Sequence, residues 1–137
     1  MPLNYGKPTD ALGKKLRDIL NDDFVNVYIS NEYKERGNES FRINLVSSNL
    51  NEQISSTMEI RDYEYEFTIY QHDNAHNQEL SLKNRLDRAV YALMRNRTLS
   101  GSCIDLVVDE VNYQIDTGNS DIIAGSFTAT ITKENIF

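Results

Sequence analysis

The chain has 137 residues, a length that predicts one domain able to bury a core without disulfides or metals. Hydrophobic residues make up 39% of it and charged residues 26%, which is typical of a soluble globular protein, and no run approaches the roughly 18 apolar residues of a membrane helix. The formal net charge of −7 argues against general nucleic-acid affinity, because phosphate binding needs a concentrated cationic face. Met1–Tyr5 lacks the basic-then-apolar pattern of a signal peptide, so we expect an unexported protein. The lone Cys103 excludes an intrachain disulfide and is expected to be a small buried residue.

The N-terminal region predicts an arm followed by a helix. Residues 1–8 are interpreted as the arm, and Thr9 can cap the helix because its hydroxyl accepts hydrogen bonds from backbone donors of the first turn. Apolar residues then recur at helical spacing along one face: Leu12, Leu16, Ile19 and Leu20. The polar run from Asn21 to Asp23 ends the helix.

Two short strands and a long polar segment follow the helix. Phe24–Ser30 alternates apolar and polar residues, and after a charged turn a second strand around Phe41–Leu45 predicts a hairpin or meander with it. Residues Ser47–Glu59 show weak periodicity, so we predict a long loop, and loops of this length are usually functional or disordered. Part of this loop is therefore a candidate for partner contact: Asn49, Leu50, Asn51, Glu52, Gln53 and Ile54.

A strongly two-faced strand and a second helix occupy the middle of the chain. Within Arg61–Gln71 the aromatic and apolar residues alternate with Asp62, Glu64, Glu66 and Thr68, so one face is core and the other is solvated or an interface. The apolar stripe of the following helix is the one expected of a helix packed on a sheet: Leu82, Leu86, Ala89, Val90, Leu93 and Met94.

The segment Cys103–Thr132 predicts a long β-hairpin with arms of about fourteen and eleven residues, against the usual five or six. The apolar positions change parity after Asp109-Glu110, and a β-bulge that bends the strand produces such a slip. On the return arm Ser126, Thr128 and Thr130 lie opposite the apolar face. The predicted fold class is α+β: a single domain, 1–137, with a mainly antiparallel sheet, two helices packed on it and the order α-β-β-β-α-β-β. A bent hairpin too long for one small sheet suggests a subunit that assembles with others.

One tripeptide, Asp116-Thr117-Gly118, matches the signature of aspartic proteases, which pair two carboxylates in an enclosed dimer interface. Only Asn119–Phe137 follows it, too little chain for a flap and the rest of the barrel, and Asn119 departs from the small residue usual there. Asp, Gly, Asn and Ser are ordinary turn formers, so a hairpin tip explains the segment.

Other candidate catalytic or metal-binding groups each lack a required partner. His72 and His76 are four residues apart, but their segment is predicted as a loop and no third ligand has diagnostic spacing. Glu64 and Glu66 lie about 7 Å apart on one strand face, a separation that suits a glycosidase pair, yet nothing nearby indicates a sugar cleft. We therefore expect no catalytic residue, no cofactor and no metal.

Basic and aromatic residues on the second helix form a further candidate surface. Arg85, Arg88 and Arg95, with Lys83 and Tyr91, could bind nucleic acid or an acidic partner surface. The alternative is a solvated face with local ion pairing.

The order of elements resembles one phage protein family. The elements that carry the resemblance are, in order, an amphipathic helix, a β-meander with a polar segment, the strand Tyr63–Ile69, the helix Leu82–Arg97 and a hairpin whose second arm runs Asp121–Ile131. The chain resembles the tail terminator and tail-to-head joining proteins of tailed bacteriophages. The resemblance covers nearly the whole chain.

The resemblance implies a structural virion protein that is not an enzyme, assembled in the host cytoplasm and located in the tail or neck. It implies a hexameric ring that caps the tail tube, contacts tube and neck proteins, and lets DNA pass without specific binding. The candidate ring contact is the polar side of the two strands: Glu64, Glu66, Ser126, Thr128 and Thr130. Alternatives are another phage neck protein, such as a head-completion or connector protein, and a small α+β module that binds a ligand between helix and sheet.

Overall fold

The computed structural model describes residues 6–22, 24, 27–29, 39–72, 78–115, 117–118 and 122–137. Helix α1 (Gly6–Asn21) begins three residues before the predicted Thr9 cap and ends where the sequence predicts. Residues 6–8, predicted as part of an arm, are therefore helical. Pro8 is compatible with this earlier start, because the backbone N–H groups of a first helical turn have no intrahelical acceptor to lose.

The seven elements follow the predicted order, and the predicted α+β class is confirmed. After α1 come β1 (Val27–Ile29), β2 (Glu39–Ser55), β3 (Met58–His72), α2 (Gln78–Met94), β4 (Asp105–Ile115) and β5 (Ile122–Ile136). The strands form one sheet in the order β1-β2-β3-β5-β4. Every pairing is antiparallel except that of β1 with β2, which is parallel. The predicted hairpin or meander between these first two strands is therefore wrong, since a hairpin joins antiparallel strands.

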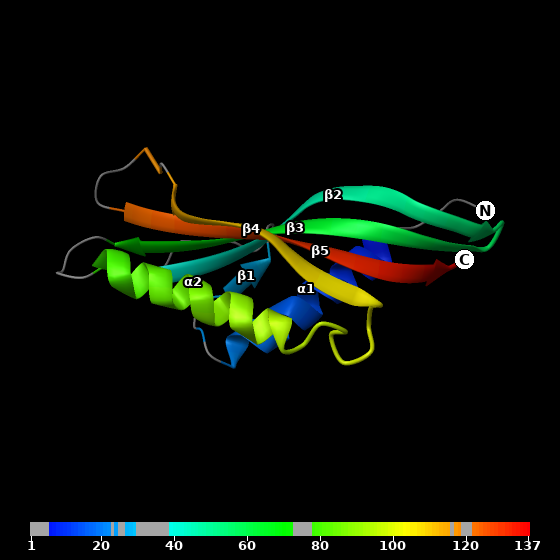
Figure 1. Ribbon diagram of the computed structural model, residues 1–137, viewed down its shortest axis with the longest axis horizontal. Coiled ribbons are helices and arrows are strands. Elements are labelled where there is room, and N and C mark those ends of the chain that lie inside the picture. Colours follow the sequence, from blue (N-terminus) through cyan, green and yellow to red (C-terminus); the bar gives the residue numbers. More distant parts are fainter. Residues whose placement is uncertain are drawn as a thin grey trace.

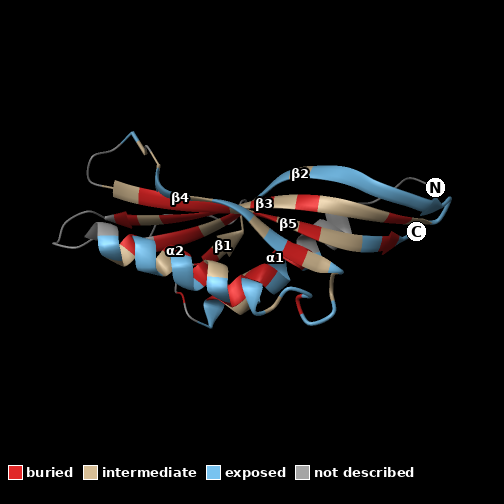
Figure 2. Ribbon diagram, viewed as in Figure 1, coloured by how far each residue is buried: buried red, intermediate tan, exposed pale blue. Residues whose placement is uncertain are grey.

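Both helices pack on the same face of the sheet, and no helix covers the opposite face in the described part of the chain (Figure 1). The core lies between the helices and the sheet, where most of the apolar stripe predicted for each helix meets the aromatic face of β3 (Figure 2). The prediction is wrong for Met94, which is 41% exposed because it lies at the last residue of α2. Phe67 of β3 stacks on Phe127 of β5 with ring centroids 4.6 Å apart. Fully buried residues of this core include Leu16, Leu86 and Ile131.

The bend predicted in the C-terminal hairpin is confirmed. The pairing of β4 with β5 shifts register between Val108 and Glu110, so Asp109 is the extra residue of a β-bulge. The predicted arm lengths are wrong: β4 has 11 residues and β5 has 15, because β5 stays paired with β3 up to Ile136. Ile104, expected beside Leu106 on the core face, precedes β4 and is exposed.

The predicted loop Ser47–Glu59 is wrong, because the structure places nearly all of it in a second long hairpin. Strand β2 has 17 residues, β3 has 15, and a turn at residues 56–57 joins them. Most side chains of this end of β2 are exposed, so no alternation of apolar and polar residues is needed (Figure 2). Three register shifts along β2 also interrupt the two-residue alternation of side chains between the two faces of the strand. Backbone pairing with β3, which leaves no trace in the sequence pattern, holds the strand.

Candidate interaction surfaces

The five residues predicted as a ring contact lie side by side on the sheet face that the helices leave bare, here called the outer face. Strands β3 and β5 pair without a register shift, which places Glu64 opposite Thr130 and Glu66 opposite Thr128. Ser126 faces Thr68 one step further along. Because side chains alternate along a strand, all of these point away from the aromatic core residues such as Tyr65.

Hydrogen bonds tie the outer face together across strands. The Thr130 hydroxyl donates to Asp109 Oδ2 at 2.6 Å, so the bulge of β4 aims its carboxylate back over β5. The Thr132 hydroxyl donates to Asp62 Oδ1 at 2.7 Å. Ser47 Oγ of β2 donates to Glu64 Oε2 at 3.3 Å. Such cross-strand pairs fix side-chain positions, so the outer face presents an ordered pattern of acceptors.

The outer face is strongly acidic. The pairing register places one guanidinium there among the described residues, that of Arg42, which faces Thr68 from β2. The register places eight carboxylates from four strands on the same face: Glu52, Asp62, Glu64, Glu66, Asp105, Asp109, Glu110 and Glu134. One of them, Asp105, is paired with Arg97 at 2.8 Å. Because no helix of the described chain covers this face, its charge is directed outward.

The predicted contact residues Asn49, Leu50, Asn51, Glu52, Gln53 and Ile54 lie on an open edge of the sheet. Strand β1 pairs with β2 at Phe41–Ile43, and beyond it no strand of the described chain pairs with the outward side of 44–55. Leu50 is 51% exposed and Ile54 is 47% exposed. An unpaired strand edge carries free backbone donors and acceptors, so this edge, here called the β2 edge, is ready to accept another strand.

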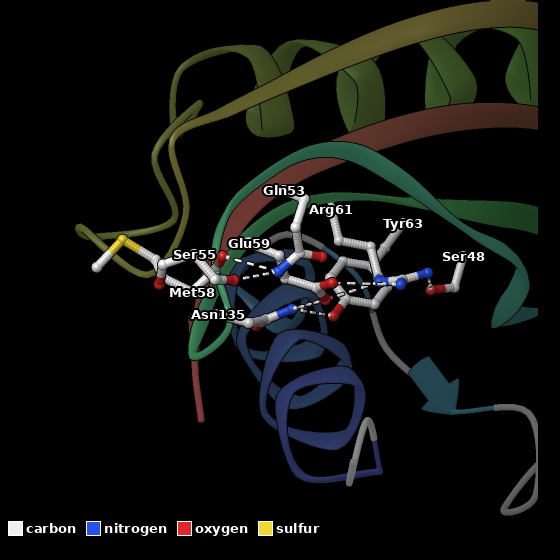
Figure 3. Close-up of polar contacts among 8 residues, drawn as sticks. All are labelled: Ser48, Gln53, Ser55, Met58, Glu59, Arg61, Tyr63 and Asn135. Carbon is white, nitrogen blue, oxygen red and sulfur yellow. Dashed lines mark hydrogen bonds and ion pairs between the residues drawn. The ribbon is translucent and has the colours of Figure 1, made fainter.

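A polar cluster reinforces the end of the sheet nearest the turn of the β2–β3 hairpin (Figure 3). Glu59 is 2% exposed and accepts a hydrogen bond from Arg61 Nε at 2.9 Å. Asn135 Nδ2 of β5 donates to the Tyr63 hydroxyl at 2.7 Å and to Glu59 Oε1 at 3.4 Å. Gln53 donates from β2 to the Ser55 and Met58 carbonyl oxygens. Sequence reasoning missed this cluster, because β5 brings Asn135 to residues more than seventy positions earlier.

The outward side of α2 presents exposed aromatic and basic side chains. Tyr91 is 63% exposed, and the Arg95 guanidinium lies 5.3 Å from its ring centroid. Arg88 lies over the Phe24 ring at 5.4 Å. A shallow surface hollow of about 370 Å³ follows the N-terminal half of α2 and is lined by Leu80, Ser81, Asn84, Arg85 and Arg88.

The groove between helix and sheet offers little room for a ligand where α2 meets β4. The hollow there, between Leu82 and Tyr113, has a volume of about 30 Å³, whereas small-molecule sites occupy roughly 300–1,000 Å³. The Tyr113 hydroxyl donates to Asp87 Oδ1 at 2.7 Å, which closes the groove and raises the pKa of Tyr113.

The sequence candidates for metal and protease chemistry lie mainly outside the described residues. His76 and Asp116 both fall outside them, and so does the side chain of His72. Within the described ranges no group of three or more His, Cys, Asp or Glu side chains could hold a metal ion. Cys103 is half-buried just before β4, and burial is the main cause of its raised thiol pKa.

The described helices include none that is long and apolar enough to cross a membrane.

Comparison with known proteins gives a likeness in structure alone. No family model and no curated protein matches the chain. A solved structure that does match is the sheath/tube terminator of an extracellular contractile injection system, PVC, in its extended state, determined by cryo-electron microscopy. The sequence identity is 14% and the TM-score is 0.44, and the match covers 96% of this chain and 58% of that chain. A likeness at this level does not define a function.

Proposed function

We propose that this protein is a tail terminator: a structural, non-catalytic subunit of a hexameric ring that caps a tail tube and joins the tail to the head or neck. The observation that carries the proposal is the bare, ordered outer face on a sheet that also has an open edge. A domain that packs both helices on one side leaves its other side available for a neighbour. The sequence resemblance to phage tail terminators supports the same role.

The two surfaces suit two kinds of contact. The outer face, with Glu64, Glu66, Ser126, Thr128 and Thr130, contacts another copy of the chain in the ring. The β2 edge contacts the tube or the adjoining neck ring by accepting a strand, since main-chain hydrogen bonds give affinity to such additions. Leu50 and Ile54 supply apolar contact beside those bonds. The negative net charge suits a ring through which DNA passes without binding.

The test is deletion of the gene in the phage or strain that carries it, followed by electron microscopy of the particles. Loss of a terminator leaves tubes of uncontrolled length that carry no heads, and the wild-type gene supplied in trans restores joined particles. Mass spectrometry of purified wild-type particles then detects the chain, and antibody labelling in electron micrographs locates it at the head-proximal end of the tail. Normal particles from the deletion mutant, or particles that lack the chain, contradict the proposal.

A further inference from the structure

Two opposite surfaces of the subunit carry opposite charge. The acidic outer face points away from the helices, whereas the outward side of α2 points away from the sheet (Figure 1). The exposed basic residues of that side include Lys83, Arg88 and Arg95. Asp87, an exposed acid of the described part of this side, already accepts the hydrogen bond of the Tyr113 hydroxyl.

The two surfaces also match in length. Lys83 and Arg95 are twelve residues apart, about 18 Å along a helix. Glu134 pairs with Ile60, which lies six residues from Glu66, about 20 Å along a strand. Asp109 lies on β4, two strands away from β3, which widens the acidic area by about 10 Å. A helix with the length of α2 that lay across the outer face could therefore contact acidic side chains along several of its turns.

Apolar side chains lie within both charged surfaces. Tyr91 stands between Arg88 and Arg95 on α2, and Leu80 and Met94 are exposed toward its two ends. On the outer face Val107 of β4 is 45% exposed and pairs in register with Thr130. Tyrosine and arginine are enriched at protein interfaces, where an aromatic anchor surrounded by polar contacts carries much of the binding energy.

We propose that α2 of one copy lies across the acidic outer face of the next copy, so that each subunit donates its helix and receives its neighbour's. This inference rests on the ring proposed above and assigns its subunit contact. The occupant is a second copy because the chain itself carries the complementary charge on its other side. Face-to-face pairing would bring the carboxylates of two outer faces together, and helix-to-helix pairing would bring the basic residues of two α2 helices together, so both two-fold arrangements are disfavoured. A head-to-tail contact uses both surfaces in every subunit, and it forms a closed ring when the rotation from one copy to the next divides a full turn evenly. The neighbour's helix then gives the bare sheet its second covering layer.

Charge reversal on each surface tests the contact. Glu64→Arg with Glu66→Arg makes the outer face basic, and Arg88→Glu with Arg95→Glu makes α2 acidic. Sedimentation velocity over a wide concentration range in low salt measures association of each variant. We expect each double variant alone to associate at least about tenfold more weakly than wild type. Salt raised from about 50 mM to about 500 mM weakens the wild-type association in the same direction.

Mixing the two variants gives the decisive result. In an equimolar mixture the unchanged helix of the first variant fits the unchanged acidic face of the second, and the two altered surfaces also match in charge. We therefore expect the mixture to recover association, with the two variants alternating around the ring. Reversals at equally exposed sites on α1, Lys15→Glu with Asp18→Arg, serve as the matched control and leave association unchanged.

Each outcome decides a different point. Association that neither reversal weakens places the ring contact elsewhere, which overturns this inference and leaves the terminator function standing. Weakening by both reversals without recovery in the mixture also overturns it, because recovery requires the helix and the face to touch. A wild-type chain that stays monomeric at every concentration in low salt overturns the charge-driven contact, while the gene deletion tests the function separately. Circular dichroism of each variant confirms that a loss of association is not a loss of fold.

Discussion

Gly125 lies where α2 approaches the sheet most closely, and Gly125→Ala tests whether that approach dictates the residue. A Cβ built at this position would lie 2.3 Å from Leu86 Cδ1 and 3.0 Å from the Asn112 backbone oxygen. Leu86 is fully buried, so its side chain cannot turn out into solvent. We expect the added methyl to destabilise the protein by about 1–3 kcal/mol, the usual cost of overpacking a core.

The sign of the change in stability distinguishes the close approach from an ordinary glycine-to-alanine substitution. Without the close approach, an alanine in a strand would stabilise the protein by about 0.4–1 kcal/mol, because glycine loses more conformational freedom on folding. Gly13→Ala on α1 is the matched control. Its Cβ would lie 3.6 Å from Ile29 Cδ1, an ordinary contact distance, so the same substitution there is expected to stabilise.

Urea unfolding measures the free energy of unfolding of each variant. The set consists of Gly125→Ala, Gly13→Ala, Leu86→Ala and the double variant Gly125→Ala/Leu86→Ala. Leu86→Ala alone should cost about 2–5 kcal/mol. The double variant should be no less stable than Leu86→Ala, because the new methyl enters the emptied space, and the coupling energy should then be about 1 kcal/mol or more. A Gly125→Ala variant as stable as wild type, or effects that simply add, would refute the argument from close approach.

Three further changes have directions that the structure fixes. Arg61→Met removes a donor from the buried Glu59 carboxylate and should lower the free energy of unfolding by about 1–3 kcal/mol in urea melts. Leu50→Asn on the exposed β2 edge should change stability by less than about 0.5 kcal/mol, yet weaken co-sedimentation of the protein with isolated tails. Asp105→Asn removes the carboxylate whose pKa is lowered below its usual 3.8, first by the hydrogen bond from Arg97. The stabilisation from that lowered pKa is present above 3.8 and is lost as the pH falls through the folded pKa. Thermal melts of variant and wild type should therefore differ at neutral pH and converge once the pH lies below the folded pKa.

The helical and strand periods are the part of the fold that the sequence predicts best. The stripe from Leu12 to Leu20 and the alternation from Tyr63 to Ile69 both indicate core faces, and the structure buries them. The parity change at Asp109 predicted a bulge, and the register shift confirms it. The alternation of apolar and polar residues along each strand likewise predicted that Glu64 and Thr128 lie on the face opposite the core. These signals are readable because burial on one face imposes a period on the local sequence.

The β2 edge is a part of the fold that the sequence pattern could not predict. Asn49–Ile54 has no period, because both faces of that strand end are exposed and backbone pairing with β3 does not require alternating apolar side chains. Polar composition and the absence of a strong period are also the signs of a loop, so the two cannot be distinguished locally. The contact role assigned to these residues stays a prediction, now for a strand edge.

The sequence by itself determined the main buried face of each helix and of β3, the order of the elements and the side of β3 and β5 that stays polar, because each of these follows from local spacing. Only the tertiary structure decided that both helices share one side of the sheet, that β1 pairs parallel to β2, and that Asn135 meets Glu59 and Tyr63. It also decided that an acidic sheet face and a basic helix face look in opposite directions. These features depend on how distant segments meet, and no short-range pattern encodes the relative placement of elements that are joined only through the core.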